Sequence, residues 1–198
     1  MSGLVDDLCG KIDGKKANIG IIGMGYVGIP LGLEFAKRGF SVTGLDKDKD
    51  RVNEINAGKQ VMKHISNEEM CNFVNNKGSA TTEFSVVDDM DCLIICVPTP
   101  LDEHEQPDMS YVEGASNAIG NHLKKVQLVV LESTTYPGTT REVVKPILEK
   151  SKLEAGKDFF LAYSPEREDP GNKEFSVSKI PKVMGGFTSG CLKVTRAL

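Results

Sequence analysis

A tight glycine-rich turn between an apolar run and an amphipathic segment constrains this chain most strongly. Residues 17–23 (ANIGIIG) lead directly into Gly23, Gly25 and Gly28, which are spaced as GxGxxG. In such a turn the first glycine allows the sharp bend, the second leaves room for a ligand, and the third lets the next helix pack closely on the strand. The N–H groups at the start of that helix favour an anion. The sequence therefore predicts a strand–turn–helix unit that binds a diphosphate.

An acidic residue at the end of the next apolar segment (SVTGLD) narrows the choice of ligand. Asp46 lies eighteen residues after Gly28. A carboxylate at this place accepts hydrogen bonds from both hydroxyls of an adenosine ribose and repels a 2′-phosphate, so it predicts NAD rather than NADP. Basic neighbours at Lys47, Lys49 and Arg51 weaken that preference. Taken alone, Asp46 is as typical of a helix N-cap or turn residue as of a residue that binds a ribose.

Short apolar runs alternate with amphipathic segments along the chain. Near-continuously apolar strands are buried on both faces, as in a parallel sheet, and the alternation requires right-handed crossovers. We therefore expect the α/β class, with a Rossmann-type doubly wound, mostly parallel sheet and helices on both faces. Expected strands cover residues 17–23, 41–46, 80–82, 91–97, 127–133, 159–164 and 182–186. Expected helices cover residues 27–38, 49–56, 66–76, 111–122, 139–150 and 188–198, with a capping box formed by Thr139 and Glu142.

Composition excludes several classes of protein. The net charge is −4 and no basic stripe with interleaved aromatic residues occurs, so we expect no nucleic-acid partner. The apolar runs are too short to cross a bilayer and the first residues do not resemble a signal peptide, so we expect no membrane partner and a cytoplasmic location.

Cysteine and histidine patterns give no sign of disulfides or metals. The five cysteines include no CxxC pair, which argues against a disulfide framework in a chain of this size. Cys92 and Cys96 fall in an apolar run and are expected to be buried hydrophobic residues on a strand. The three histidines lack the spacing of metal ligands, so no metal site is predicted.

Polar residues follow three of the predicted strands, where ligands lie in open α/β sheets. Two prolines flank one threonine, a cluster of hydroxyls precedes a helix, and a charged cluster follows the sixth strand. An alternative is that the hydroxyls cap helices and form turns, and that the charged cluster is a solvated turn. The candidate residues are Pro98, Thr99, Ser133, Thr134, Glu166 and Arg167.

Four motifs occur in a characteristic order: GMGYVGIPL, VPTPL followed by PDMSYVEGA, ESTTYPGTT, and YSPEREDPGN. Over residues 17–186 they resemble the UDP-glucose/GDP-mannose dehydrogenase family. The resemblance is strongest to the branch that oxidises UDP-N-acetylglucosamine or its manno epimer, because UDP-glucose enzymes look more like NPEFLREG where this chain has SPEREDPGN. A UDP-glucose 6-dehydrogenase is the alternative.

The resemblance implies oxidation of the C6 alcohol of a UDP-sugar to a carboxylate in two NAD-dependent steps. The route passes through an aldehyde, a cysteine-bound thiohemiacetal and a thioester that water hydrolyses. It also implies that Thr134 helps position that water, that Glu166 acts on it as an acid or base, and that Arg167 lies along the substrate. The implied NAD contacts are Gly23, Gly25, Tyr26, Val27, Gly28, Asp46, Arg51, Pro98, Thr99, Ser133 and Thr134.

The chain departs from the family pattern in two respects. UDP-glucose enzymes carry a second glutamate where this chain has Pro170, so that contact is not implied here. The family also has a long central helix with a catalytic lysine and asparagine, followed by a second domain with a nucleophilic cysteine in a glycine-rich segment. None of the five cysteines matches it, and Cys191 lacks the glycine-rich surroundings.

We therefore expect an N-terminal extension at 1–15, an NAD-binding Rossmann domain at 16–187, the start of a truncated central helix at 188–198, and no C-terminal substrate domain. Such a fragment is predicted to bind NAD without turnover. The family implies a homodimer for the complete protein, and the state of the fragment stays open. One alternative function is a stand-alone NAD-sensing module, but such a module needs neither Glu166 nor the ESTTYPG segment. Another is a 3-hydroxyacid or 6-phosphogluconate type dehydrogenase, which would not explain the SPEREDPG motif.

Overall fold

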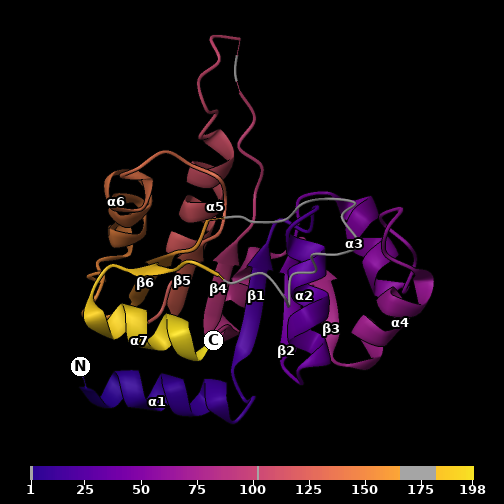
Figure 1. Ribbon diagram of the computed structural model, residues 1–198, viewed down its shortest axis with the longest axis horizontal. Coiled ribbons are helices and arrows are strands. Elements are labelled where there is room, and N and C mark those ends of the chain that lie inside the picture. The colour runs from indigo at the N-terminus through magenta and orange to yellow at the C-terminus, as the bar shows by residue number, and fades with distance from the viewer. Residues whose placement is uncertain (1, 102, 166–181) are drawn as a thin grey trace.

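The computed structural model describes residues 2–101, 103–165 and 182–198, which form a seven-stranded sheet with helices on both faces (Figure 1). The spatial order is β3-β2-β1-β4-β5-β6-β7, with parallel pairing throughout except between β6 and β7. This confirms the predicted doubly wound, mostly parallel sheet. The strands are β1 (Asn18–Ile22), β2 (Ser41–Leu45), β3 (Gly78–Thr81), β4 (Cys92–Ile95), β5 (Leu128–Leu131), β6 (Phe160–Tyr163) and β7 (Gly185–Gly186).

The helices form one layer on each face of the sheet. Buried residues of α1, α2, α4 and α7 belong to the core on one face, and those of α5 and α6 to the core on the other. The helices are α1 (Ser2–Asp13), α2 (Gly28–Lys37), α3 (Lys49–Asn56), α4 (Asn67–Asn75), α5 (Ser110–Gly120), α6 (Lys145–Leu148) and α7 (Ser189–Ala197). Short helical turns are η1 (Phe84–Asp89), η2 (Thr140–Val144) and η3 (Glu149–Ser151).

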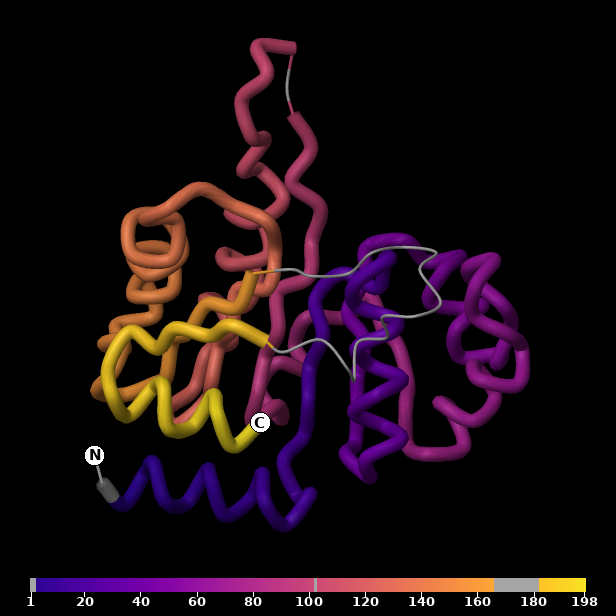
Figure 2. The backbone as a smooth tube through the Cα atoms, viewed as in Figure 1, coloured from indigo at the N-terminus to yellow at the C-terminus, as the bar shows by residue number. Residues whose placement is uncertain are grey.

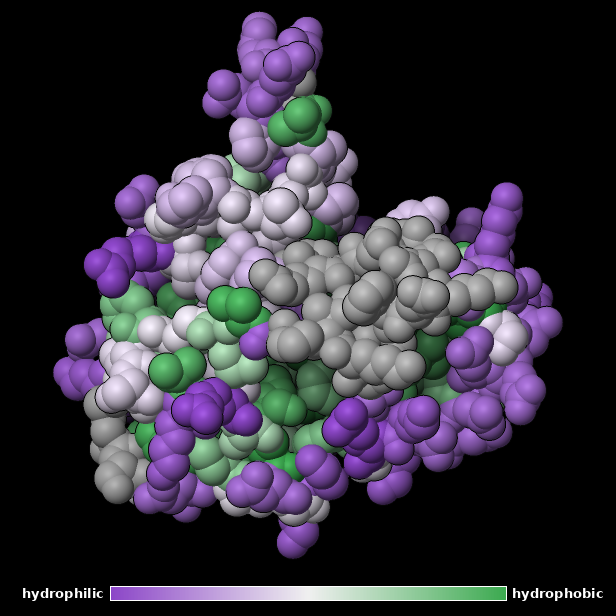
Figure 3. Space-filling view, viewed as in Figure 1, coloured by the Kyte–Doolittle hydropathy of each residue, from purple (hydrophilic) through white to green (hydrophobic). Residues whose placement is uncertain are grey.

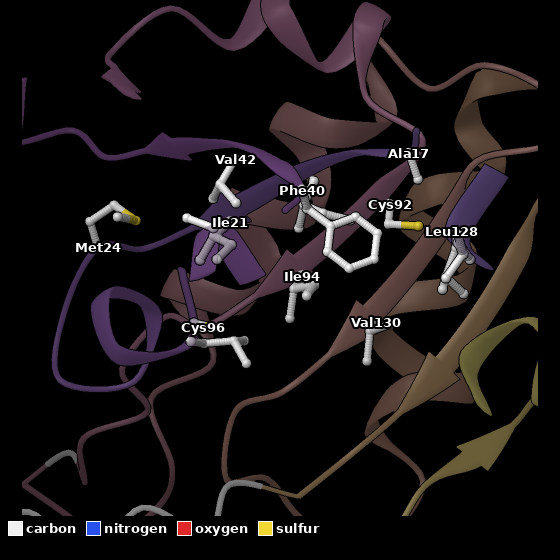
Figure 4. Packing of buried hydrophobic residues seen from close by; sticks show 14 of the residues in the cluster. Ala17, Ile21, Met24, Phe40, Val42, Cys92, Ile94, Cys96, Leu128 and Val130 are labelled. Atoms are coloured by element: carbon white, nitrogen blue, oxygen red, sulfur yellow. The ribbon is translucent and has the colours of Figure 1, made fainter. Parts of the chain in front are cut away.

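The central strands are buried and apolar apart from Asn18 at the start of β1, because helices cover each face of the sheet. Ile21, Ile94 and Val130 are partners in register on β1, β4 and β5, and they lie in the core on the α2 face (Figure 4). The next residues along two of those strands, Ile22 and Ile95, lie in the core on the α5 face. Successive side chains of a strand point to opposite faces, so each strand contributes to both cores.

The first helix joins the core instead of standing apart from it. Val5, Leu8 and Ile12 of α1 are spaced along one helix face, and all three are buried. They belong to the same core as Cys191 and Val194 of α7, and the two helices lie side by side near the chain ends (Figure 2). A helix over residues 188–198 is thus confirmed, and it packs on this sheet. Its assignment as the start of a central helix stays a prediction.

The predicted capping box at Thr139 is wrong. Gly138 has φ +100°, and Thr139 after it is already helical with φ −46° and ψ −47°, whereas an N-cap residue needs extended backbone. The Thr139 hydroxyl donates instead to the carbonyl of Tyr136 at 2.7 Å. The predicted helix is also irregular, because a π-helical turn, one α-helical turn and a 3₁₀ turn follow one another.

The predictions about membrane helices, metal ligands and the two cysteines of residues 91–97 can be compared with the described residues. Within the described residues, no helix has the length and apolar character needed to cross a membrane. The same residues contain no group of three or more histidine, cysteine or acidic side chains arranged to hold a metal. Cys92 and Cys96 are buried on and just after β4, as predicted, and burial raises the pKa of the Cys92 thiol far above its usual range.

Candidate functional site

A pocket of about 450 Å³ opens at the carboxyl ends of β1, β2 and β4. Its volume is within the range of small-molecule sites, and its place is the one where open α/β sheets bind ligands. The predicted cofactor residues that line it are Gly23, Gly25, Tyr26, Val27, Asp46, Arg51 and Pro98.

The three glycines of the turn have different surroundings. Gly23 has φ +95°, and a Cβ there would lie 2.7 Å from the Cys96 carbonyl oxygen. A Cβ at Gly28 would lie only 2.0 Å from the Gly23 oxygen, so α2 packs against the turn at a distance that only glycine allows. A Cβ at Gly25 would meet no atom within 4 Å. Gly25 therefore faces open space, where a ligand can approach the backbone.

The start of α2 is open to an anion. Helix α2 begins at Gly28, and its N-cap residue Val27 provides no side-chain acceptor for the free N–H groups. The helix dipole favours negative charge at this end. The Ile29 N–H already donates to the Gly25 carbonyl at 3.1 Å, and Pro30 has no N–H. The donors left for an anion therefore come from the turn up to Gly28. Because Val27 and Gly25 both line the pocket, these donors lie beside it. A diphosphate fits this arrangement.

Asp46 holds the turn and faces the pocket at the same time. One carboxylate oxygen accepts the N–H of Met24 at 2.8 Å, and the other accepts the N–H of Asp48 at 3.0 Å. The N-cap of α3 is Asp48, which accepts from Asp50 and Arg51, so Asp46 is a turn residue and not a helix cap. A carboxylate has about four acceptor positions, so two remain for ribose hydroxyls.

Two cations balance the acidic groups of this wall. The Arg51 guanidinium donates to the Met24 carbonyl at 3.0 Å and lies 4.0 Å from the Asp48 carboxylate. Lys47 also lines the pocket, and its ammonium lies 3.8 Å from where a Cβ of Gly114 would stand. Arg51 thus stabilises the turn through its hydrogen bond to the Met24 carbonyl, and its charge stays near the pocket.

Ten further residues of the lining were not predicted from the sequence. They are apolar residues at the strand ends, the charged residues Lys47 and Asp48 that follow β2, and residues from η1 and α5. The strand ends follow from the rule that ligands lie beyond the strands, whereas no local signal marks which face of α5 turns toward the pocket. The additional lining residues are Ile22, Leu45, Lys47, Asp48, Phe84, Cys96, Val97, Tyr111, Gly114 and Ala115.

Two hydroxyls connect the ends of β4 and β5. Thr99 Oγ1 donates to the Thr134 carbonyl at 2.6 Å, and Ser133 Oγ donates to the Val97 carbonyl at 2.7 Å. Ser133 is only 3% exposed, so its hydroxyl serves the fold. The neighbouring Glu132 is buried and forms an ion pair with Lys182.

Some candidate residues lie outside this pocket. Gly28, Thr99, Ser133 and Thr134 do not line it, although Thr99 and Thr134 adjoin its β4 edge through the bond just described. Their contacts with NAD stay predictions. The two charged candidates Glu166 and Arg167 lie outside the described residues.

Residues 17–198 match the sequence profile of the UDP-glucose/GDP-mannose dehydrogenase family, NAD binding domain. The UDP-N-acetyl-D-glucosamine 6-dehydrogenase of Pseudomonas aeruginosa is 41% identical over 177 residues, which cover 88% of this chain and 41% of the relative. The UDP-N-acetyl-D-mannosamine dehydrogenase of Escherichia coli K12 is 34% identical over 184 residues, covering 88% of this chain and 43% of that relative.

Solved structures agree with this assignment. The NDP-N-acetyl-D-galactosaminuronic acid dehydrogenase of Methanosarcina mazei has a TM-score of 0.87 at 31% identity, covering 98% of this chain and 43% of that one. A ternary complex of GDP-mannose dehydrogenase from Pseudomonas aeruginosa has a TM-score of 0.78 at 30% identity, covering 91% and 44%. The chain thus spans less than half the length of these relatives. With its open glycine turn, its carboxylate on β2 and its match over residues 17–198, the chain belongs to the UDP-glucose/GDP-mannose dehydrogenase family and contains that family's NAD-binding domain.

Proposed function

We propose that this chain is the cofactor-binding part of a nucleotide-sugar 6-dehydrogenase that oxidises a UDP-N-acetylhexosamine, with UDP-N-acetylglucosamine as the preferred substrate. The observation that carries the proposal is the pocket itself, where an uncapped helix start and an Asp46 carboxylate meet beside an open Gly25. The similarity to UDP-N-acetylglucosamine and UDP-N-acetylmannosamine dehydrogenases supports the class of sugar.

In this proposal, different residues of the pocket bind the diphosphate, the adenosine ribose and the adenine ring of NAD. The start of α2 and the Gly25 backbone hold the diphosphate, and Asp46 accepts from the adenosine ribose. The slot between Leu45 and Tyr111 takes the adenine ring, because its lining is largely apolar. NAD bound in this way supplies the hydride acceptor.

The other end of the cofactor extends toward the ends of β4 and β5. There the Thr99 hydroxyl fixes the Thr134 main chain, and Thr134 itself is exposed. We assign to Thr134 the positioning of the water that completes the second oxidation, and to Glu166 the proton transfer on that water. We assign Arg167 to contact with the substrate. For a complete protein of this family we propose a homodimer in the cytoplasm.

The decisive test uses the complete polypeptide that the gene encodes. With UDP-N-acetylglucosamine and NAD it is expected to form two NADH per uronate, and to work far more slowly on UDP-glucose. The variant E166Q should lose most of this turnover while its affinity for NADH stays unchanged. Equal rates on UDP-glucose would contradict the substrate assignment, and full activity of E166Q would contradict the role of Glu166.

The 198-residue chain alone gives a second test. It is expected to bind NADH but to form none from NAD and a UDP-sugar, because no residue within it matches the family's nucleophilic cysteine. Cys191 is buried, and its sulfur accepts from the Leu161 N–H at 3.4 Å, so it faces the core and not a substrate. Uronate formation by this chain, followed by mass spectrometry, would disprove the prediction.

A further inference from the structure

An exposed aromatic pair borders the diphosphate-binding turn. Tyr26 lies between Gly25 and Val27, lines the pocket and is 64% exposed. Its ring stacks on the imidazole of His64, with 6.2 Å between ring centroids and 15° between ring planes. This geometry is that of an offset-stacked pair, which stabilises by more than its buried area alone. His64 comes from the connection between α3 and α4, not from a segment that directly follows a strand.

The connection that carries His64 is held firmly in place. The side-chain amide of Gln60 donates to the Ile65 carbonyl at 2.8 Å, and the Gln60 N–H donates to the Asn67 side chain at 2.6 Å. Ile65 is only 3% exposed and belongs to the core on the α2 face. A capping box then starts α4 directly afterwards. The exposed His64 is therefore presented to the turn by an anchored segment.

We propose that His64 is a positioning residue for the diphosphate-binding turn, acting through the ring of Tyr26. The proposal rests on the proposed binding of NAD at this turn. The turn can bind well only when its N–H groups already point at the diphosphate, because ordering them during binding costs free energy. Gly25 leaves the main chain beside Tyr26 conformationally free, so a contact that fixes the Tyr26 ring restricts the turn that carries those N–H groups. The stack on His64 fixes the ring before the ligand arrives.

The test is a set of NADH titrations on the 198-residue chain. H64A removes the stacking partner and is expected to weaken NADH binding about two- to tenfold, the effect of one aromatic pair. H64F keeps a flat ring without a charge or a ring nitrogen, so it is expected to bind like the wild type. K63A is the matched control, because Lys63 is an exposed cation on the same connection and has no ring. ADP-ribose, which contains the same diphosphate, should respond as NADH does.

A double-mutant cycle separates this role from a general effect on the fold. If His64 acts through Tyr26, Y26A and H64A together should cost no more than Y26A alone. The unfolding temperature of the ligand-free variants should fall by no more than the loss of one exposed ring contact explains, because both rings are exposed.

Three results would overturn the proposal: wild-type affinity in H64A, a loss in H64F as large as in H64A, or additive losses in the double variant. Absence of NADH binding by the wild type would instead refute the proposed function on which the inference rests.

Discussion

At the scale of single residues, Asp46 has two functions that can be separated. Its carboxylate accepts the Met24 N–H at 2.8 Å, and it lines the pocket, where we propose that it binds the adenosine ribose. The variant D46N keeps one acceptor, which can serve the Met24 N–H, but loses the charge and the acceptor for the Asp48 N–H. We expect NADH binding to weaken about tenfold or more, since hydrogen bonds to charged groups contribute about 1.5–3 kcal/mol. NADPH binding should weaken less or improve, because repulsion of the 2′-phosphate is relieved. Equal losses for both cofactors in parallel titrations would contradict this account of Asp46.

Gly114 offers a way to fill the pocket without disturbing the protein. It lies in α5, and a Cβ there would approach only the Lys47 ammonium, at 3.8 Å. G114L is expected to lower NADH affinity at least tenfold, while the ligand-free protein becomes no less stable because leucine favours helix more than glycine does. G10L is the control, since a Cβ at Gly10 in α1 also meets open space but lies outside the pocket. Unchanged NADH affinity in G114L would mean that the ligand does not occupy the slot beside α5.

At the scale of elements, α1 is predicted to stabilise the domain without taking part in binding. Ile12 is fully buried in the core shared with α7, and Leu8 is 1% exposed. Truncating either side chain to alanine should lower the free energy of unfolding by about 2–5 kcal/mol. Urea unfolding measures the change, and L101A serves as the control because Leu101 is 64% exposed. If I12A leaves the unfolding midpoint unchanged, α1 is not part of the folded core in solution.

The sequence predicted some elements well because their signal is local. Strands β4 and β5 are unbroken apolar runs, β1 is apolar after Asn18, and the glycine turn between β1 and α2 has the GxGxxG spacing of a phosphate-binding turn. Helix α1 was missed because charged residues interrupt its apolar positions, and it becomes a core element only when α7 covers it. The capping box failed because the conformation of Gly138 decides whether Thr139 lies before the helix or within it.

The residues of the candidate site also fall into those that the sequence predicts and those that it does not. Gly23, Gly25 and Asp46 were found because backbone geometry fixes their spacing in the sequence. Tyr111 and Gly114 were not found, since their place in the pocket depends on how α5 packs against the sheet. His64 was also missed, because a connection between two helices brings it to the turn from outside the strand ends.

At the scale of the whole molecule, the pocket borders both cores, because Ile22, Leu45 and Ala115 of one core and Cys96 of the other also line it. The helices cover the faces, whereas the pocket uses the carboxyl edge of β1, β2 and β4. The segment between β4 and α5 projects beyond this edge and is mostly hydrophilic on its visible surface (Figure 3). A ligand bound at this edge therefore contacts residues of the folded core, and its binding should raise the unfolding temperature by mass action.

The most direct test of the account is a calorimetric titration of the 198-residue chain with NADH, made beside the variant G25V. A valine side chain at residue 25 meets no protein atom near its Cβ, so the variant should fold as stably as the wild type. The wild type is predicted to bind one NADH per chain, and G25V to lose binding because its side chain occupies the place of the diphosphate. Binding of NADH by G25V with wild-type affinity would contradict the placement of the cofactor at this turn.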